Sequence, residues 1–334
     1  MSEQIQASSV GEAGTSSRSR YAATALGWFS RSGMVMVFVL LFVLLSAGVP
    51  NFLSLRNLQG LLLSVSLIGG ISVTMMLVLA LGEVDLSVAS VVAFSGVVAS
   101  AIITATHSVA AGIAAGVLAG ATVGLVNGLV VARLRVNSLI ATLAMMEIVR
   151  GLAYIVSHGE AVIISEESFF KLGAGSIAGI GVPIWENLLL FLLFGWLLNS
   201  TVFGKNVLAI GGNSEAARLA GIEVARVKII VFVMQGLVTG LAGVLLAARM
   251  SLGDPKTSQG LELGVISACV LGGVSLSGGV ATISGVLVGV LIMGSVQNAL
   301  SLLNVPTFYQ YVIRGAILLM AVLFDQLRQR RRHD

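Results

Sequence analysis

Long apolar runs alternate with short polar segments along almost the whole chain. An α-helix needs about 20 mainly apolar residues to cross the hydrocarbon core of a bilayer. Ten runs are close to that length: 33–49, 58–81, 88–106, 109–132, 139–156, 184–200, 229–248, 261–275, 281–300 and 309–324. The pattern predicts an all-α fold, a polytopic transmembrane helical bundle with about ten spans.

Two glycine-containing breaks, 82–87 and 273–279, interrupt this pattern and are candidates for re-entrant segments. Leu81–Ser87 and Leu271–Ser277 agree at five of seven positions. Transporters often place interrupted helices in matched halves beside the translocation path. A short match of Gly, Leu and Ser also arises by chance in such a composition, so the repeat supports a path without establishing one.

The composition excludes a soluble domain, because the chain is 57% hydrophobic and 10% charged and soluble domains carry about 25% charged residues. If the N-terminus is cytoplasmic, thirteen Lys and Arg residues fall in cytoplasmic segments and four in outer segments. This distribution follows the positive-inside rule and predicts that both termini are cytoplasmic. Because the basic residues are distributed by membrane side, the net charge does not indicate nucleic-acid binding. We expect a flexible tail at 1–32, a transmembrane domain at 33–327 and a basic tail at 328–334.

A polar segment at 201–228 separates two apolar runs and falls on the cytoplasmic side in this orientation. Asn213 can cap a short helix there, Glu215 suits its first turn, and Gly221 can end it. Apolar side chains on one face of that helix would allow it to dock into a groove of another protein. An ordinary solvated loop is the alternative. The candidate coupling residues are Gly211, Gly212, Asn213, Glu215, Ala216, Ala217, Arg218, Leu219 and Gly221.

The fourth apolar run carries a glycine at every fourth position, which leaves one helix face without side chains. A neighbouring helix can then approach its backbone closely, so we expect a packing role rather than a ligand site. The residues of this glycine ridge are Gly112, Gly116, Gly120, Gly124 and Gly128.

Ionisable residues at membrane depth are the candidates for function. Glu147 and Arg150 are three positions apart and can form a structural ion pair on one helix face, which we favour over a proton relay. Asp85 can cap the following helix through the amides of Ser87 and Val88, or it can line a path. The candidate path residues are Asp85, Asn127, Gln235, Gln297 and Asn298.

Motifs of soluble catalysis are missing from the sequence. Gly204-Lys205 is followed by Asn and lacks the earlier glycine of a phosphate-binding loop. His107, His158 and His333 do not have metal-ligand spacing. We therefore expect a transport subunit that binds no metal or cofactor and hydrolyses no ATP itself. Aromatic residues make up only 6% of the chain, so we expect tight selection of a sugar to occur in another subunit.

Four ordered segments resemble signatures of bacterial monosaccharide ABC permeases, the group of the ribose, xylose, galactose and arabinose systems. They are 82–90, 127–136, 209–222 and 270–279, and the resemblance extends over residues 33–327. Within the group, 148–156, 167–170 and 265–273 are most similar to L-arabinose permeases. Glu83 departs from a common form of the first signature, which has glycine there, and this puts in doubt any role that needs a close-packed, uncharged backbone at that point.

The resemblance implies a multi-pass permease of the bacterial inner membrane. It implies three protein partners: a second copy of the chain, a cytoplasmic subunit with two ATPase domains that uses ATP and magnesium, and a periplasmic sugar-binding protein. Two alternatives stay open, namely a secondary symporter with proton sites at Glu147 and Asp85, and a related permease for another solute such as a branched-chain amino acid. Mutual neutralisation of Glu147 and Arg150 would favour a neutral solute.

Overall fold

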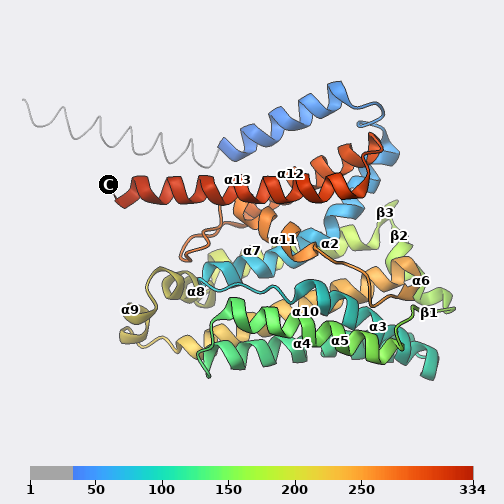
Figure 1. The fold of residues 1–334 in the computed structure, drawn as a ribbon, viewed down its shortest axis with the longest axis horizontal. Helices are drawn as coiled ribbons and strands as arrows, with labels where there is room; N and C mark the ends of the chain where they lie inside the picture. Colours follow the sequence, from blue (N-terminus) through green and yellow to red (C-terminus); the bar gives the residue numbers. More distant parts are fainter. Residues whose placement is uncertain (1–32, 334) are drawn as a thin grey trace, which may run out of the picture.

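The computed structural model describes residues 33–333, and this part of the chain is almost entirely helical (Figure 1). The helical segment Gly33–Gly48 comes first. The helices that follow it are α2 (Leu55–Ala80), α3 (Val88–Thr106), α4 (Val109–Ala132), α5 (Ser138–Ser157), α6 (Glu167–Ala174), α7 (Val182–Ser200), α8 (Val202–Gly212), α9 (Ser214–Leu219), α10 (Val224–Met250), α11 (Leu261–Leu271), α12 (Ile283–Leu302) and α13 (Thr307–His333). The all-α prediction is confirmed.

Four two-residue strands form two short antiparallel pairs. β1 (Val162–Ile163) pairs with β4 (Leu252–Gly253), and β2 (Ser176–Ile177) pairs with β3 (Ile180–Gly181). These strands and α6 lie at one end of the bundle, while α8 and α9 lie at the other (Figure 1).

Each of the ten predicted spans contains a helix, but the helices differ in length. Within the described residues, seven are long and apolar enough to cross a membrane: α2, α3, α4, α5, α7, α10 and α12. The apolar helices Gly33–Gly48, Leu261–Leu271 and Thr307–Leu323 are shorter. At about 1.5 Å per residue, the eleven residues of α11 reach only about 16 Å, roughly half of a hydrocarbon core.

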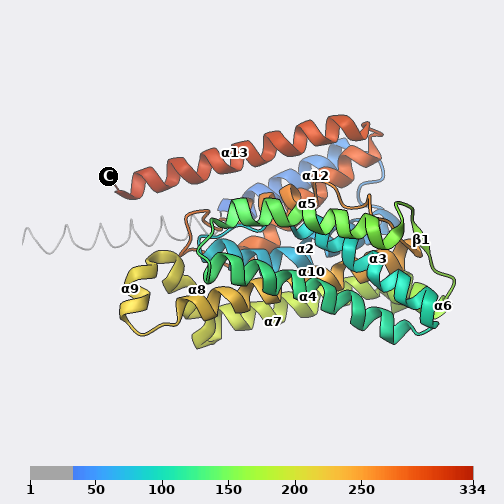
Figure 2. The same cartoon turned by 60° about the horizontal axis from the view of Figure 1, so that its bottom comes forward.

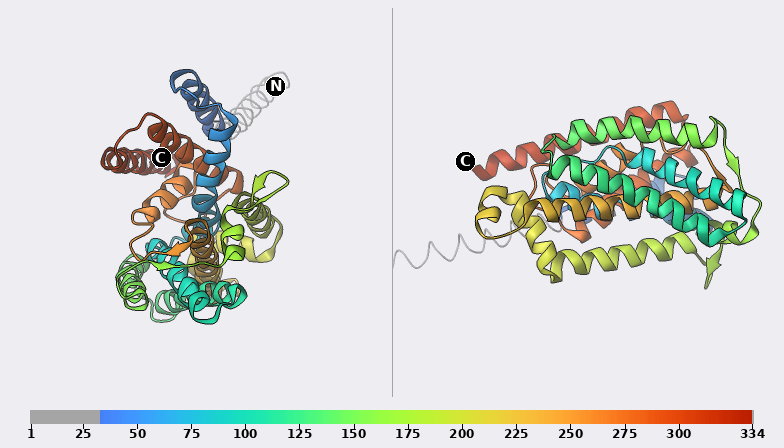
Figure 3. Two further views of the ribbon diagram at one scale, coloured as in Figure 1. Left: turned by 90° about the vertical axis from the view of Figure 1, so that its right-hand side faces the viewer. Right: turned by 90° about the horizontal axis from the view of Figure 1, so that it is seen from below.

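Helices α2 and α10 form the centre of the bundle. In the most apolar stretch of α2, 78% of the residues are buried, and α10 packs against α2, α3 and α4. Helices α7 and α13 lie on opposite flanks of this centre (Figure 2). The views in Figure 3 show the same arrangement from the end and from below. The core is therefore made of apolar helices packed on one another, as the sequence pattern requires.

The tail 1–32 lies outside the described residues. The predicted tail at 328–334 does not begin as a separate segment, because α13 continues as a helix to His333. In the polar segment 201–228, α8 precedes the predicted short helix, so the connection between α7 and α10 contains two helices.

Candidate functional site

Helix α9 is formed by signals within its own sequence. The side-chain oxygen Oδ1 of Asn213 accepts hydrogen bonds from the amides of Glu215 (3.1 Å) and Ala216 (2.9 Å). Gly221 follows the helix with a φ of +86°, where a side chain would be strained. Arg218 forms an ion pair of 2.5 Å with Glu215, and this contact lowers the pKa of the Glu215 carboxyl.

One exposed side of α9 carries apolar residues, next to the exposed Glu215 and Arg218. Leu219 has 79% of its surface exposed, and Ala216 and Ala220 are also exposed. Ala217, in contrast, is only 5% exposed and packs into the main core. Ala217 was predicted among the coupling residues; the structure places it about 100° around the helix from Ala216, facing this chain.

The two breaks in the helical pattern meet each other beside α8. The amide of Gly279 donates a hydrogen bond of 2.9 Å to the carbonyl of Ala80, the last residue of α2. A Cβ atom on Gly278 would lie 2.8 Å from the carbonyl oxygen of Gly211 and 2.9 Å from the amide nitrogen of Gly82. We call this contact the glycine junction; its residues are Gly82, Gly211, Gly212, Gly278 and Gly279.

The glycine junction explains why the matched segments are rich in glycine. A Cβ atom on Gly211, Gly278 or Gly279 would lie within 3.0 Å of opposing backbone atoms. Gly82, Gly278 and Gly279 also have positive φ angles. Helix α8 ends in this junction, and only Asn213 separates it from α9. The end of α8, which leads into α9, is therefore in direct backbone contact with the end of α2 and with Gly278 and Gly279.

Asp85 and Asn127 lie in one buried polar cluster. The carboxylate of Asp85 accepts hydrogen bonds from the amide (2.9 Å) and hydroxyl (2.6 Å) of Ser87. The side-chain amide of Asn127 donates to the same Ser87 hydroxyl at 3.0 Å. Of the two amides expected to donate to Asp85 at the start of α3, that of Ser87 does so. The cluster lies inside this chain, where these bonds satisfy the buried carboxylate.

The N-terminal turns of α5 hold the break at 82–87 in place. The amide of Val84 donates to the Ser138 hydroxyl at 3.2 Å, and the amide of Leu86 donates to the Thr142 hydroxyl at 3.1 Å. These hydroxyls supply acceptors that a continuous helix would have provided from its own carbonyls.

The other predicted path residues do not join this cluster. Asn298 on α12 exchanges two hydrogen bonds of 2.9 Å with Asn57 on α2. Gln235 is buried within α10 and donates to Thr239 on the same helix at 3.4 Å. Gln297 lies on α12, half-buried. The five residues are therefore distributed over several helix contacts.

The expected ion pair between Glu147 and Arg150 is not formed. Arg150 Nη1 instead donates hydrogen bonds to the carbonyls of Pro255 (2.6 Å) and Thr257 (3.0 Å). Among the described residues, Glu147 has neither an ion pair nor a hydrogen bond from its side chain. The spacing permits a pair, but the loop between β4 and α11 folds over α5 and offers Arg150 two acceptors. The sequence pattern contains no signal for that contact.

The glycine ridge of α4 faces α3 and α10. A Cβ atom on Gly116 would lie 2.7 Å from the Ser95 carbonyl oxygen of α3. One on Gly120 would lie 2.7 Å from the Gly240 Cα atom of α10. Close approaches of this kind are found along the whole ridge: Gly112 faces α3, and Gly124 and Gly128 face α10. The helices pack backbone to backbone, in the manner expected for small residues in membrane helices.

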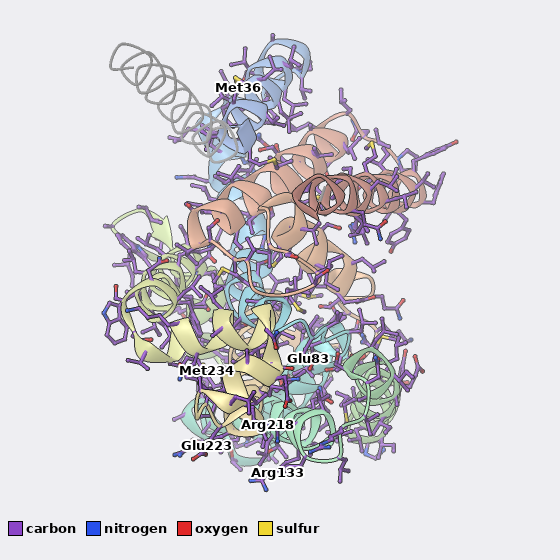
Figure 4. All side chains as sticks on the ribbon, turned by 90° about the vertical axis from the view of Figure 1, so that its left-hand side faces the viewer. Met36, Glu83, Arg133, Arg218, Glu223 and Met234 are labelled. Carbon is purple, nitrogen blue, oxygen red and sulfur yellow. The ribbon has the colours of Figure 1, made fainter. Side chains whose placement is uncertain are left out.

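A charged groove beside α9 was not predicted. It has a volume of about 660 Å³ and lies between α9, the start of α10 and the connection from α4 to α5. Glu83 forms an ion pair with Lys228 there, and their side chains are 14% and 19% exposed. Figure 4 shows Glu83, Arg133, Arg218 and Glu223 at this end of the bundle. The carboxylate at position 83 thus has a cationic partner within this chain.

Comparisons with known proteins find a transport-permease family and related permeases. Residues 57–322 match the family described as branched-chain amino acid transport system / permease component. The L-arabinose ABC transporter permease protein AraH of Azospirillum brasilense is 71% identical over 303 residues, which cover 91% of this chain and 89% of the relative. The L-arabinose transport system permease protein AraH of Escherichia coli (strain K12) is 54% identical over 298 residues, or 89% of this chain and 91% of the relative.

A ribose permease is more distant. The ribose import permease protein RbsC of Escherichia coli (strain K12) is 37% identical over 306 residues, which cover 90% of this chain and 95% of the relative. No solved structure matches the chain significantly. Because the family match covers most of its length and these relatives align over about nine-tenths of it, the chain belongs to the branched-chain amino acid transport system / permease component family of multi-pass membrane permeases.

Proposed function

We propose that this chain is the membrane-spanning permease subunit of an ATP-driven, binding-protein-dependent importer of L-arabinose. The observation that carries the proposal is α9, a capped helix at one end of the bundle with an exposed apolar face and a backbone connection to both interrupted segments. L-arabinose is favoured over ribose because the relatives named for L-arabinose are 71% and 54% identical, against 37% for the ribose permease.

In this proposal, α9 inserts into a groove of a cytoplasmic ATPase subunit. Leu219 supplies the apolar contact, and the exposed Glu215–Arg218 pair borders it. Movement of the ATPase then displaces α8, and the glycine junction transfers that displacement to the segments around 82–87 and 273–279. An ATPase with two domains would need two α9 helices, which two copies of this chain would supply.

The proposed topology has ten crossings, with both termini cytoplasmic, in the bacterial inner membrane. The C-terminal end of α13 lies at the same end of the bundle as α9, which is the end that the distribution of basic residues places in the cytoplasm (Figure 1). Helix α11 completes its crossing together with the irregular segment that follows it. Such backbone is tolerated at membrane depth where protein surrounds it.

The solute assignment rests on the relatives and not on charge balance. Because Glu147 and Arg150 are not paired, their mutual neutralisation cannot be used as an argument for a neutral solute. A periplasmic sugar-binding protein would supply tight selection.

The proposal is tested by co-purifying the chain with its ATPase and reconstituting both in proteoliposomes. We expect uptake of L-arabinose that requires the sugar-binding protein and ATP, with much slower uptake of ribose and leucine. Accumulation of sugar driven by a proton gradient, without ATP or the other subunits, would overturn the assignment and support a symporter.

A further inference from the structure

Glu147 is placed at the middle of a membrane span. It is the tenth of the twenty residues of α5, so it lies about 14 Å from the start of a helix about 30 Å long. A hydrocarbon core is also about 30 Å thick. The carboxylate is therefore close to the bilayer midplane, far from either headgroup layer.

The surroundings of Glu147 within its own chain are open. Its side chain is exposed, as are the apolar neighbours Ile140 and Ile148 on the same helix. One turn further on, Gly151 has no heavy atom within 4 Å of the position of a Cβ. In the most apolar stretch of α5, only 22% of the residues are buried, the smallest share among the seven candidate spans. This face of α5 must meet something other than the described part of this chain.

Lipid is a poor neighbour for such a group. Carboxylates at the bilayer centre are rare, and they face a bundle interior or a water-filled cavity rather than acyl chains. The other carboxylates near the helix breaks are satisfied, since Asp85 bonds Ser87 and Glu83 pairs with Lys228. Among the described residues, Glu147 has no ion pair and no side-chain hydrogen bond; it lies within electrostatic reach of Arg150, whose guanidinium is bonded to backbone carbonyls instead. This long-range interaction leaves the carboxylate exposed and without a hydrogen-bond donor.

Further polar groups continue along the same side toward the end opposite α9. Arg150 on α5 and Arg314 on α13 hold the loop before α11 through its backbone carbonyls. Glu262 on α11 lies within electrostatic reach of both arginines. At the other end, Asn137 at the start of α5 lines the charged groove beside α9. Helix α5 thus carries polar groups from one end of the bundle to the other.

We propose that Glu147 lines the translocation path between two copies of the chain and contacts the solute. Its two carboxylate oxygens accept hydrogen bonds from neighbouring hydroxyls of a passing neutral sugar, in a water-filled space that keeps the contact weak. The inference rests on the proposed function, since it identifies a residue that a permeating polyol meets at the midplane.

Water accessibility provides the first test. The chain has one cysteine, Cys269, which is buried, so Cys269→Ser provides a background for introducing single cysteines. Glu147→Cys is compared with Leu192→Cys, the eleventh of nineteen residues in α7 and 63% exposed among apolar neighbours. In the assembled transporter, a water-soluble thiol reagent should modify position 147 at least about tenfold faster than position 192, and L-arabinose with its binding protein should slow the reaction.

Equal and slow reaction at both positions would overturn the inference and place Glu147 against lipid. Oxidative cross-linking between two 147 cysteines that resist the water-soluble reagent would also overturn it, in favour of a dry contact between copies.

Transport provides the second test. Glu147→Leu should lower the maximal rate of L-arabinose uptake at least about tenfold, whereas Glu147→Gln, which keeps an acceptor, should retain a third or more. The half-saturating sugar concentration should change little, because the binding protein sets it. Wild-type uptake by Glu147→Leu would contradict a solute contact. A wild-type transporter without L-arabinose uptake would refute the proposed function instead, and the labelling contrast would still decide where Glu147 lies.

Discussion

A single methyl group added at Gly120 should destabilise the bundle strongly. Its Cβ would lie 2.7 Å from the Cα and 3.0 Å from the amide nitrogen of Gly240, and it would overlap the carbonyl oxygen of Gly236. Non-bonded carbon atoms prefer separations of about 3.5–4.0 Å. Helices α4 and α10 would therefore have to separate by about 1 Å, because the opposing atoms are backbone atoms that no rotamer change can remove.

The expected change in the free energy of unfolding of Gly120→Ala is the difference between two opposing effects. Overpacking of a well-packed contact costs about 1–3 kcal/mol and occasionally more, and rigid backbone on both sides places Gly120→Ala near the upper end. Replacing a helical glycine with alanine gains up to about 1 kcal/mol from helix propensity. We expect a net loss of about 2 kcal/mol. Gly120→Leu, with a larger side chain at the same contact, should prevent folding.

The buried cysteine supplies the assay. Cys269 is 0% exposed, so a thiol-reactive fluorophore will label it only as the protein unfolds on heating in detergent. A loss of 2 kcal/mol should lower the unfolding midpoint of Gly120→Ala by roughly 5 °C. Gly60→Ala is the matched control, because Gly60 is an exposed helical glycine of α2 with no heavy atom within 4 Å of the added Cβ. It should melt at or above the wild-type temperature. If both variants melt alike, the close approach of α4 and α10 is refuted.

Three further changes probe the α9 end of the bundle. Leu219→Asp should leave the melting temperature unchanged but abolish co-purification of the ATPase, because Leu219 is exposed. Ala217→Asp should lower the melting temperature, because Ala217 packs inside this chain. If Leu219→Asp retains as much ATPase as the wild type, α9 is excluded from the contact. Gly211→Ala would place a methyl group against the carbonyl oxygen of Ala80 and 2.5 Å from the amide nitrogen of Gly279, so it should lower the melting temperature and, in protein that still folds and binds the ATPase, reduce ATP-driven uptake. Normal uptake would argue against transmission through the glycine junction. Glu83→Gln should lower the free energy of unfolding by about 3 kcal/mol, because it leaves Lys228 without its carboxylate partner. The double variant Glu83→Gln with Lys228→Met should regain part of the lost melting temperature. No such gain would show that the pair does not set the stability.

The membrane class, the helices and the caps of α9 could be predicted because their causes are local. An apolar run of about 20 residues can satisfy its backbone in lipid only as a helix or a closed barrel strand, and strands need only about 10 residues. Asn213 caps the helix it directly precedes, and Gly221 ends it through its own backbone conformation. The spacing of the glycine ridge likewise indicated a bare helix face before any neighbour was known.

Contacts between distant segments were decided only by the tertiary structure. Glu147 and Arg150 satisfy the spacing rule for a helical pair, but a loop more than a hundred residues away provides Arg150 with better-placed carbonyls. Ala217 resembles its exposed neighbours in sequence, yet the path of the chain from α8 to α10 turns it into the core. The repeat at 82–87 and 273–279 predicted two breaks, whereas their contact with each other beside Gly211 depends on how α2, α8 and the segment after α11 pack together. The physical reason is that caps and helix periodicity depend on neighbours within about four residues, while ion-pair choice, burial and backbone contact depend on atoms that only folding brings together.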